Sequence, residues 1–136
     1  MGDSERELLV EAEATIGRVK YQAIVKSGSH TIIADEPLEL EGMDTGMSPY
    51  NLLLASLASC TIITLRMYIE RKMWNIDEIG IALELFKTPD GIFIDSKLTF
   101  SGELNDAQKS RLVTIADACP IHKILVGNIE INNSLK

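Results

Sequence analysis

A strongly apolar, uncharged segment from Leu52 to Leu65 constrains the fold of this 136-residue chain more than any other feature. Ser48 and Pro49 stand just before it, and they suit the N-cap and the first position of a helix. The apolar side chains lie on all sides of such a helix, so we expect its first three turns to be surrounded by protein. At 14 residues the segment is too short to span a bilayer. The pattern therefore predicts a buried helix that runs to about Lys72.

The flanking sequence predicts short strands and further helices. Strands are expected at 8–17, 19–26, 30–34, 78–87, 92–101 and 128–133, and helices at 106–117 and from Cys119-Pro120 to about Gly127. Pro89-Asp90-Gly91 is typical of a hairpin turn, and Asn105 of a helix N-cap. Consecutive strands with segregated helices indicate an α+β fold with a largely antiparallel sheet. The length fits one domain over residues 1–136.

Charge and cysteine content narrow the class of function. The formal net charge of −7 repels nucleic acid and anionic lipid, so we expect neither as a partner. The N-terminal ten residues lack the basic start and apolar run of a signal peptide, which favours a cytoplasmic location. Two cysteines are too few for a disulfide-rich secreted scaffold. In a reducing compartment they are either apolar fillers or reactive thiols.

Cys60 and Cys119 differ in their local surroundings. Cys60 lies in the middle of the predicted long helix, where its neighbours three and four residues away carry no basic group, so this helix offers no partner for a thiolate. A small apolar filler is the alternative reading of this residue. Cys119 precedes Pro120 at the start of a helix, where free backbone N–H groups lower a thiol pKa, and His122 follows three residues later. A buried capping residue is the alternative reading here.

A zinc site is a further possibility for these residues. Cys119 and His122 have a spacing compatible with zinc, and Cys60 and His30 complete a set of four ligands. Structural zinc sites, however, normally use closely paired cysteines or histidines, and the chain has no such pair. We therefore predict no metal.

Two segments together resemble the OsmC-like family, which includes the organic hydroperoxide resistance proteins. Residues 35–74 (DEPLELEGMDTGMSPYNLLLASLASCTIITLRMYIERKMW) match a loop rich in Asp and Gly that leads into Ser-Pro and an apolar helix, with a Cys eleven residues beyond the Pro. Residues 115–125 (IADACPIHKIL) match the family's second signature, a Cys-Pro that opens a short helix. The resemblance extends over about residues 15–134.

The resemblance implies a fold, an assembly and a reaction. Family members are α+β proteins with a long buried central helix, and they form intertwined two-fold homodimers. They reduce hydroperoxides, with Cys60 as the implied nucleophile and Cys119 as the implied resolving cysteine. Small thiols or lipoyl groups on proteins return the disulfide to the dithiol, so no bound cofactor is expected.

The resemblance also assigns a role to Arg18, with one departure nearby. In the organic hydroperoxide branch an Arg from an N-terminal strand holds the thiolate and the peroxide, and Arg18 lies at a matching distance before the helix. The same branch pairs that Arg with a Glu beside the helix-opening Pro, whereas this chain has Tyr50 and Asn51 there. Unless Glu41 or Asp44 substitutes for it, no carboxylate remains. The chain thus looks more like the broader OsmC-like branch.

Apolar side chains on the long helix suggest the kind of substrate. We expect Leu53, Leu57, Ile63 and Met67 to form a wall that favours an alkyl hydroperoxide over hydrogen peroxide. Two other functions remain open: a non-catalytic protein that binds an apolar ligand or partner in the same pocket, and a redox sensor whose disulfide alters the binding of a partner.

Overall fold

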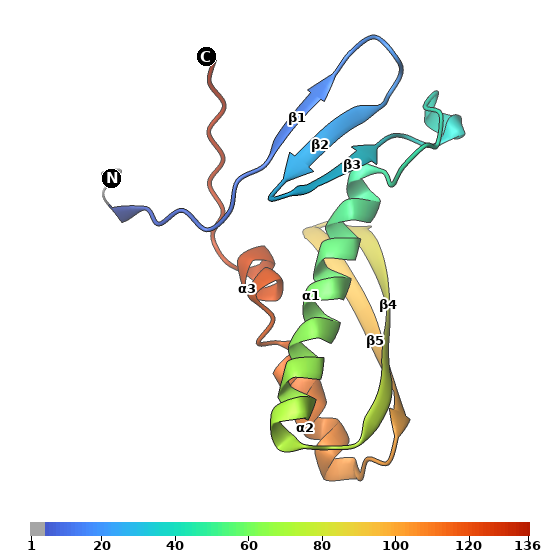
Figure 1. Cartoon of the computed structure of the whole chain (residues 1–136), viewed down its shortest axis with the longest axis vertical. Helices are drawn as coiled ribbons and strands as arrows, with labels where there is room; N and C mark the ends of the chain where they lie inside the picture. Colours follow the sequence, from blue (N-terminus) through green and yellow to red (C-terminus); the bar gives the residue numbers. More distant parts are fainter. Residues whose placement is uncertain (1–4) are drawn as a thin grey trace. The chain divides into compact units, whose positions relative to one another are not determined.

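A computed structural model describes residues 5–136, which form mixed helix and antiparallel sheet (Figure 1). The chain divides into two compact units, an N-terminal unit that ends at Leu52 and a C-terminal unit from Leu53 to Lys136. The single domain expected from the chain length stays a prediction. The elements in order are β1 (Glu13–Ile16), β2 (Ala23–Ser27), β3 (His30–Ala34), η2 (Leu38–Leu40), α1 (Pro49–Lys72), β4 (Ile76–Thr88), β5 (Gly91–Gly102), α2 (Asp106–Ala116) and α3 (Pro120–Val126).

The N-terminal unit contains a three-stranded antiparallel sheet in the order β1-β2-β3. Ile24 of β2 pairs with Thr15 on one side and with Ile33 on the other. β1 and β2 are shorter than predicted, because residues 8–12 have no regular secondary structure and residues 17–22 form the bend and turn that join the two strands. The three strands themselves confirm the prediction of consecutive hairpins.

A buried carboxylate organises the loop between the sheet and α1. The Asp35 side chain is only 2% exposed. It accepts hydrogen bonds from the hydroxyl of Thr45 and from four backbone N–H groups, those of Tyr21, Glu36, Met43 and Thr45. These bonds, led by the Thr45 hydroxyl and only partly opposed by burial, hold the pKa of Asp35 well below its usual range.

Two positions of the same loop require glycine, because a backbone carbonyl group lies very close to each of them. A Cβ on Gly42 would lie 2.1 Å from the carbonyl oxygen of Glu36, and a Cβ on Gly46 would lie 1.9 Å from that of Ile33. Side chains cannot be accommodated at such distances without moving the backbone. The Asp- and Gly-rich composition of residues 35–47 is therefore a requirement of the loop's own packing.

Helix α1 begins and ends where its sequence predicts. The Ser48 hydroxyl accepts the N–H of Asn51 at 3.2 Å, and Pro49 is the first helical residue. Arg71 and Lys72 occupy the last turn, where cations interact favourably with free carbonyls. Met73 then takes a left-handed conformation (φ 56°) that ends the helix.

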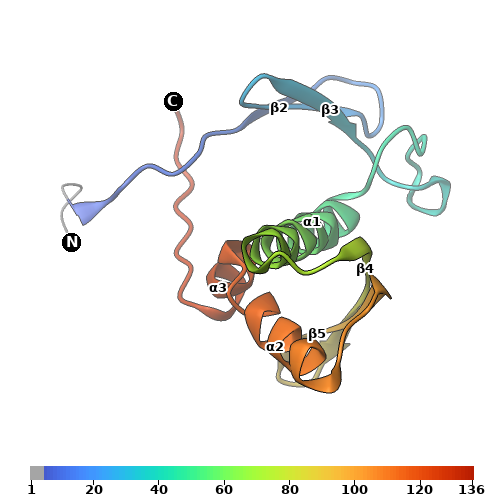
Figure 2. The same cartoon turned by 60° about the horizontal axis from the view of Figure 1, so that its bottom comes forward.

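The C-terminal unit packs α1 and α2 against the β4–β5 hairpin. Figure 2, which looks roughly along α1, shows these elements around a common interior. Its centre is a cluster of four buried residues, Leu65 and Ile69 of α1, Ile76 of β4 and Leu112 of α2. The predicted Asn105 cap is confirmed as a capping box, in which Asn105 and Gln108 exchange side-chain to backbone hydrogen bonds of 2.7 and 2.9 Å.

The elements of the C-terminal unit cover one stripe of α1. Its buried residues recur at helical spacing: Leu57, Thr61, Leu65, Tyr68 and Ile69. Leu53, Ile63 and Met67 are 40, 52 and 60% exposed. The expectation that protein surrounds the first turns of the helix stays a prediction, because the C-terminal unit by itself supplies only the hairpin, α2 and α3 to cover it.

By length and composition α1 could cross a membrane, and among residues 5–136 it is the only helix that could. The prediction that the helix is too short to span a bilayer counted only the apolar segment of 14 residues. The full helix has 24 residues. The core helix of a globular protein passes the same test. Here the C-terminal half of α1 packs on protein, since the Arg66 guanidinium donates to the carbonyl of Ile76 at 2.9 Å.

The predicted strand at 128–133 is not formed. Residues 128–136 have no regular secondary structure, and Ile129 and Ile131 are exposed. A strand needs a neighbour that pairs with its backbone groups, and no strand of the described residues pairs with this segment. The alternation of apolar and polar residues was therefore not sufficient to predict a strand.

We expect the loop around Asp35 to make folding sensitive to acid. Because the native pKa of Asp35 is lowered, its contribution to stability is complete above the unfolded pKa of about 3.9 and is lost as the pH falls toward the native pKa. Asp35→Asn should lower the unfolding temperature at pH 7 and reduce its decrease between pH 5 and pH 3. Thermal unfolding by circular dichroism measures both effects. Glu39→Gln, on the exposed η2, is the matched control, and equal acid sensitivity in both variants would contradict the assignment.

Candidate functional site

The C-terminal unit brings its two cysteines together. Cys60 lies in the middle of α1 and is half-buried, while Cys119 is the N-cap of α3 and is wholly buried. Both thiols are free, and their side chains lie within hydrogen-bonding reach of each other. Residues 59 positions apart in the sequence thus form one site, which we call the cysteine pair.

Several hydrogen-bond donors converge on the sulfur of Cys119. The backbone N–H of His122 donates to it at 3.4 Å. The Cys60 thiol and the backbone N–H of Ile121 are also within reach. The Thr61 hydroxyl lies nearby but donates its hydrogen to the carbonyl of Leu57 at 2.8 Å. Burial raises the pKa of Cys119, but these donors together outweigh it, so the pKa lies below its ordinary value. The lowered pKa expected from the helix start is present, although His122 contributes through its backbone.

The environment of Cys60 has the opposite effect. Burial, followed by the hydrogen bond with Cys119, raises the pKa of Cys60, and the backbone N–H of Ile121 and the hydroxyl of Thr64 offset this only in part. The absence of a basic neighbour on the same helix turn agrees with the sequence pattern. Within the C-terminal unit, the implied nucleophile is therefore the less acidic of the two thiols.

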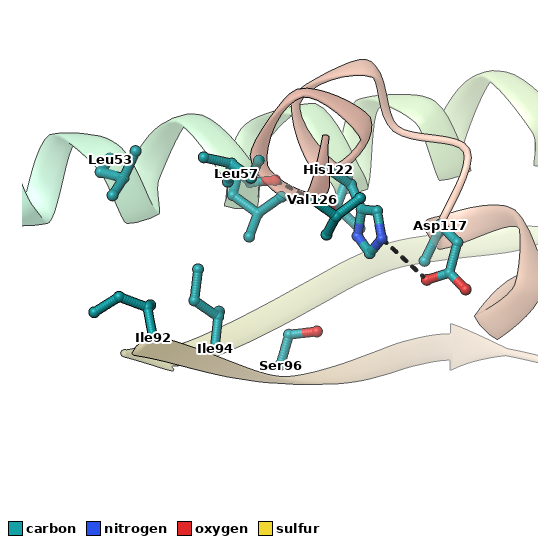
Figure 3. Close-up of a pocket in the computed structure, with 11 residues that line it drawn as sticks. Leu53, Leu57, Ile92, Ile94, Ser96, Asp117, His122 and Val126 are labelled. Atoms are coloured by element: carbon teal, nitrogen blue, oxygen red, sulfur yellow. Dashed lines mark hydrogen bonds and ion pairs between the residues drawn. The ribbon is translucent and has the colours of Figure 1, made fainter. Parts of the chain in front are cut away.

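A cavity of about 430 Å³ lies beside the cysteine pair, between α1, β5 and α3 (Figure 3). Leu53 and Leu57 of α1 face Ile92 and Ile94 of β5 across it. Thr61 lines the cavity and also contacts Cys119, so it connects this space with the pair. Most of the other walls are aliphatic, which suits an alkyl chain better than a charged ligand.

The polar end of this cavity was missed by sequence reasoning. The imidazole Nε2 of His122 lies 4.0 Å from a carboxylate oxygen of Asp117, and Figure 3 shows the two side chains at one side of the cavity. Ser96 of β5 adds a hydroxyl to the same wall. Asp117 lies two residues before Cys119, and this position was the only available signal.

Half of the predicted apolar wall is misplaced. Leu53 and Leu57 line the cavity, but Ile63 and Met67 lie on another face of α1, beside a shallow hollow that also involves Arg66. The reason is helical geometry, because residues 57 and 63 differ by six positions and point in different directions. The prediction of one apolar wall along the whole helix is therefore wrong.

Arg18 lies in the N-terminal unit, in the exposed bend between β1 and β2. Its proposed contact with the Cys60 thiolate stays a prediction. That Glu41 or Asp44 takes the place of the missing Glu also stays a prediction. Both residues adopt positive φ angles in the loop around Asp35. Tyr50 is exposed on the first turn of α1.

Among residues 5–136, no three His, Cys, Asp or Glu side chains gather in a way that could hold a metal ion. His30, the fourth member of the possible zinc set, is in β3 of the N-terminal unit, whereas Cys60, Cys119 and His122 belong to the C-terminal unit.

Together, the fold and the site define an α+β protein with a two-cysteine thiol centre beside an apolar cavity. The family model described as OsmC-like protein matches residues 42–134, which include both cysteines. The chain belongs to the OsmC-like family.

Solved structures of similar fold support this assignment. An OsmC-like protein from Mycoplasma pneumoniae superimposes with a TM-score of 0.74 at 20% identity, and the match covers 90% of each chain. An organic hydroperoxide resistance protein OsmC from Legionella pneumophila has a TM-score of 0.62 at 24% identity, with 89% of this chain and 91% of that chain covered. The organic hydroperoxide resistance protein OhrB of Bacillus subtilis has a TM-score of 0.59 at 25% identity, with 89 and 93% covered. No curated protein sequence matches the chain significantly.

The contact between the two thiols leads to a direct test. On treatment with one equivalent of peroxide, Cys60 and Cys119 should form an intrachain disulfide, because neither sulfur has to travel far to reach the other. Peptide mass mapping without reduction should show the cross-linked peptides in more than half of the oxidised protein. In Cys119→Ser, Cys60 should instead proceed to sulfinic acid. Sulfinic Cys60 beside free Cys119 in the unmodified protein would remove the resolving role.

Proposed function

We propose that this protein is a thiol-dependent hydroperoxide reductase in which Cys60 attacks the peroxide and Cys119 resolves the product. The single observation that carries the proposal is the contact between two free thiols beside an apolar cavity. Structural relatives described as organic hydroperoxide resistance proteins support the same chemistry.

The reaction follows from ordinary thiol chemistry. The Cys60 thiolate attacks one peroxide oxygen, the O–O bond breaks, and an alkoxide leaves and is protonated to an alcohol. The Cys119 thiolate then attacks the sulfur of the Cys60 sulfenic acid, which forms the disulfide and releases hydroxide. An external dithiol, such as a small thiol or a protein-bound lipoyl group, reduces the disulfide, so the protein needs no bound cofactor. A reducing cytoplasm suits such a cycle.

Ionisation of Cys60 accounts for only part of the required acceleration. An ordinary thiol with a pKa of about 8.5 is a few per cent ionised at pH 7, so full ionisation gains at most roughly 30-fold, or about 2 kcal/mol. The rest has to come from orienting the peroxide and stabilising the departing alkoxide. The guanidinium of Arg18 is the group proposed for both tasks, because it offers several N–H donors and a permanent charge.

The aliphatic cavity points to an organic hydroperoxide as substrate. Leu53, Leu57, Ile92 and Ile94 offer an alkyl group an apolar surface, whereas hydrogen peroxide gains nothing from it. Thr61, between the cavity and Cys119, marks the end at which the peroxide group would lie.

We further propose that the active form is a two-fold homodimer. The face of α1 that carries Ile63 and Met67 is apolar and exposed in the single chain. Ile129 and Ile131 are exposed in a segment that no strand of the described chain pairs with. A second copy that covers the helix face would remove this apolar surface from water.

The dimer is tested by mass in solution. Light scattering at low micromolar concentration should give about twice 15.0 kDa. Met67→Asp places a charge on the exposed face of α1 and should shift the mass toward 15.0 kDa, since an unpaired charge in an apolar interface is strongly unfavourable. Glu70→Ala, which alters an exposed polar residue of the same helix, should leave the dimer intact. A well-folded monomer of the unmodified chain would contradict the proposal.

Steady-state peroxide consumption tests the proposed function. The protein should turn over cumene hydroperoxide faster than hydrogen peroxide, with dithiothreitol and then dihydrolipoamide as reductants. Cys60→Ser should abolish turnover, and Arg18→Ala should slow it by at least about tenfold if the guanidinium stabilises the departing alkoxide. Ser59→Ala, an exposed neighbour on the same helix, is the matched control.

Each alternative function gives a different result in this assay. A redox sensor would undergo one slow oxidation without turnover, and a non-catalytic binding protein would consume no peroxide. Either result from the unmodified protein would contradict a reductase.

A further inference from the structure

The cavity beside the cysteine pair has an apolar end and a polar end. Leu53 and Thr61 both line it and lie eight residues apart on α1, which is about 12 Å along the helix axis. In Figure 3, Leu53 and Ile92 lie at one end of the cavity. The side chains of His122 and Asp117 lie at the other end. An alkyl group therefore belongs at the first end and a peroxide group at the second.

The polar end of the cavity adjoins both sulfur atoms of the cysteine pair. His122 donates its backbone N–H to the Cys119 sulfur at 3.4 Å, and its imidazole lines the cavity. The backbone N–H of Ile121, one residue earlier, is within reach of the Cys60 sulfur. The first turn of α3 thus contacts both thiols and carries an imidazole to the end of the cavity where a peroxide would be attacked.

The side chains at this end differ in their ability to release a proton. Among the described residues that line the cavity, those with an O–H or N–H group on the side chain are Thr61, Ser96 and His122. The Thr61 hydroxyl already donates to the carbonyl of Leu57 at 2.8 Å. A serine hydroxyl donates hydrogen bonds but keeps its proton near pH 7, whereas an imidazolium readily gives its proton up. His122 is therefore the proton donor that this cavity offers to a peroxide.

The surroundings of His122 suit repeated proton transfer. Its Nε2 lies 4.0 Å from a carboxylate oxygen of Asp117, whose side chain is 73% exposed. An ion pair so exposed adds little stability, but it favours one orientation of the ring. The side chain of His122 is itself 37% exposed, so solvent can return a proton to the imidazole after each turnover.

We propose that the imidazolium of His122 is the general acid that protonates the alkoxide as it departs from the peroxide. The inference rests on the proposed reductase function and names the source of a proton that this function requires. The guanidinium of Arg18, proposed to stabilise the same oxygen by its charge, keeps its protons near pH 7. The two groups therefore have separate tasks.

The proposed step balances in protons and electrons. An electron pair of the Cys60 thiolate forms an S–O bond to the terminal peroxide oxygen while the O–O bond breaks. The departing oxygen takes the proton of the His122 imidazolium, so the products are a sulfenic acid, an alcohol and a neutral imidazole. The Cys119 thiolate then attacks the sulfur of the sulfenic acid, and the S–O bond breaks to release hydroxide. The peroxide gains two electrons, and the two cysteines lose two as they form the disulfide.

A change of leaving group tests this role directly. Cumene hydroperoxide releases an alkoxide, which needs a proton, whereas peroxybenzoic acid releases a carboxylate, which is stable without one. Rapid quenching with an alkylating reagent measures the loss of free Cys60 in a single turnover of the full-length protein with each peroxide. In His122→Gln, which keeps a hydrogen-bond donor but cannot transfer a proton, the ratio of the cumene hydroperoxide rate to the peroxybenzoic acid rate should fall by at least about tenfold.

Two further variants and one isotope measurement complete the test. Ser96→Ala removes the other free hydroxyl at the polar end and should leave the ratio of the two rates unchanged. Ser59→Ala, away from the cavity, is the matched control and should leave both rates unchanged. In the unmodified protein, replacing H₂O by D₂O should slow the reaction of cumene hydroperoxide more than that of peroxybenzoic acid, because only the first transfers a proton as the O–O bond breaks.

The outcomes separate this inference from the proposed function. An unchanged ratio in well-folded His122→Gln, or a ratio that falls in Ser96→Ala instead, would overturn the role of His122 and leave the reductase in place. A His122 that served only to pack α3 would slow both peroxides equally, which also leaves the ratio unchanged. No reaction of the unmodified protein with either peroxide would overturn both proposals. Should His122→Gln fail to fold, the isotope comparison decides, and equal isotope effects would overturn the inference.

Discussion

Helix α1 carries apolar side chains on all its faces, and covering them is the constraint on which the rest of this structure depends. The hairpin, α2 and α3 cover one stripe, with Leu65 and Ile69 in the buried core. The same stripe continues toward the helix start through Thr61 and Leu57, where it lines the cavity. The buried stripe of α1 therefore contributes both to the core and to the site, because Thr61, the residue that follows Cys60, belongs to it.

The burial of Cys119 has an electrostatic consequence. An isolated thiolate in an apolar interior is unfavourable, so a buried thiol normally has a raised pKa. Cys119 departs from this because the Cys60 thiol and the backbone N–H groups of His122 and Ile121 are directed at its sulfur. Cys60 lacks an equivalent set, and a charge on its neighbour disfavours a second charge on itself.

The Asp35 loop shows the same principle with a different group. One carboxylate collects hydrogen bonds from residues as far apart as Tyr21 and Thr45, and this allows a glycine-rich loop to adopt a defined shape before α1 begins. Gly42 and Gly46 belong to that arrangement, since the carbonyl groups of Glu36 and Ile33 occupy the space of a side chain. In family signatures of this kind, conspicuous Asp and Gly residues can serve the loop itself and need not touch a substrate.

Local chemistry in the sequence was sufficient to predict most elements, and tertiary packing decided the site. Ser48-Pro49, the hairpin turn and Asn105 act on their immediate neighbours, so the bounds of α1, β4, β5 and α2 could be predicted closely. Segments distant in the sequence decide which face of α1 is buried and bring Cys60 and Thr61 close to Cys119. The segment 128–133 has the pattern of a strand but no partner in the described chain. A strand pattern is a local property, whereas pairing and burial require a second surface.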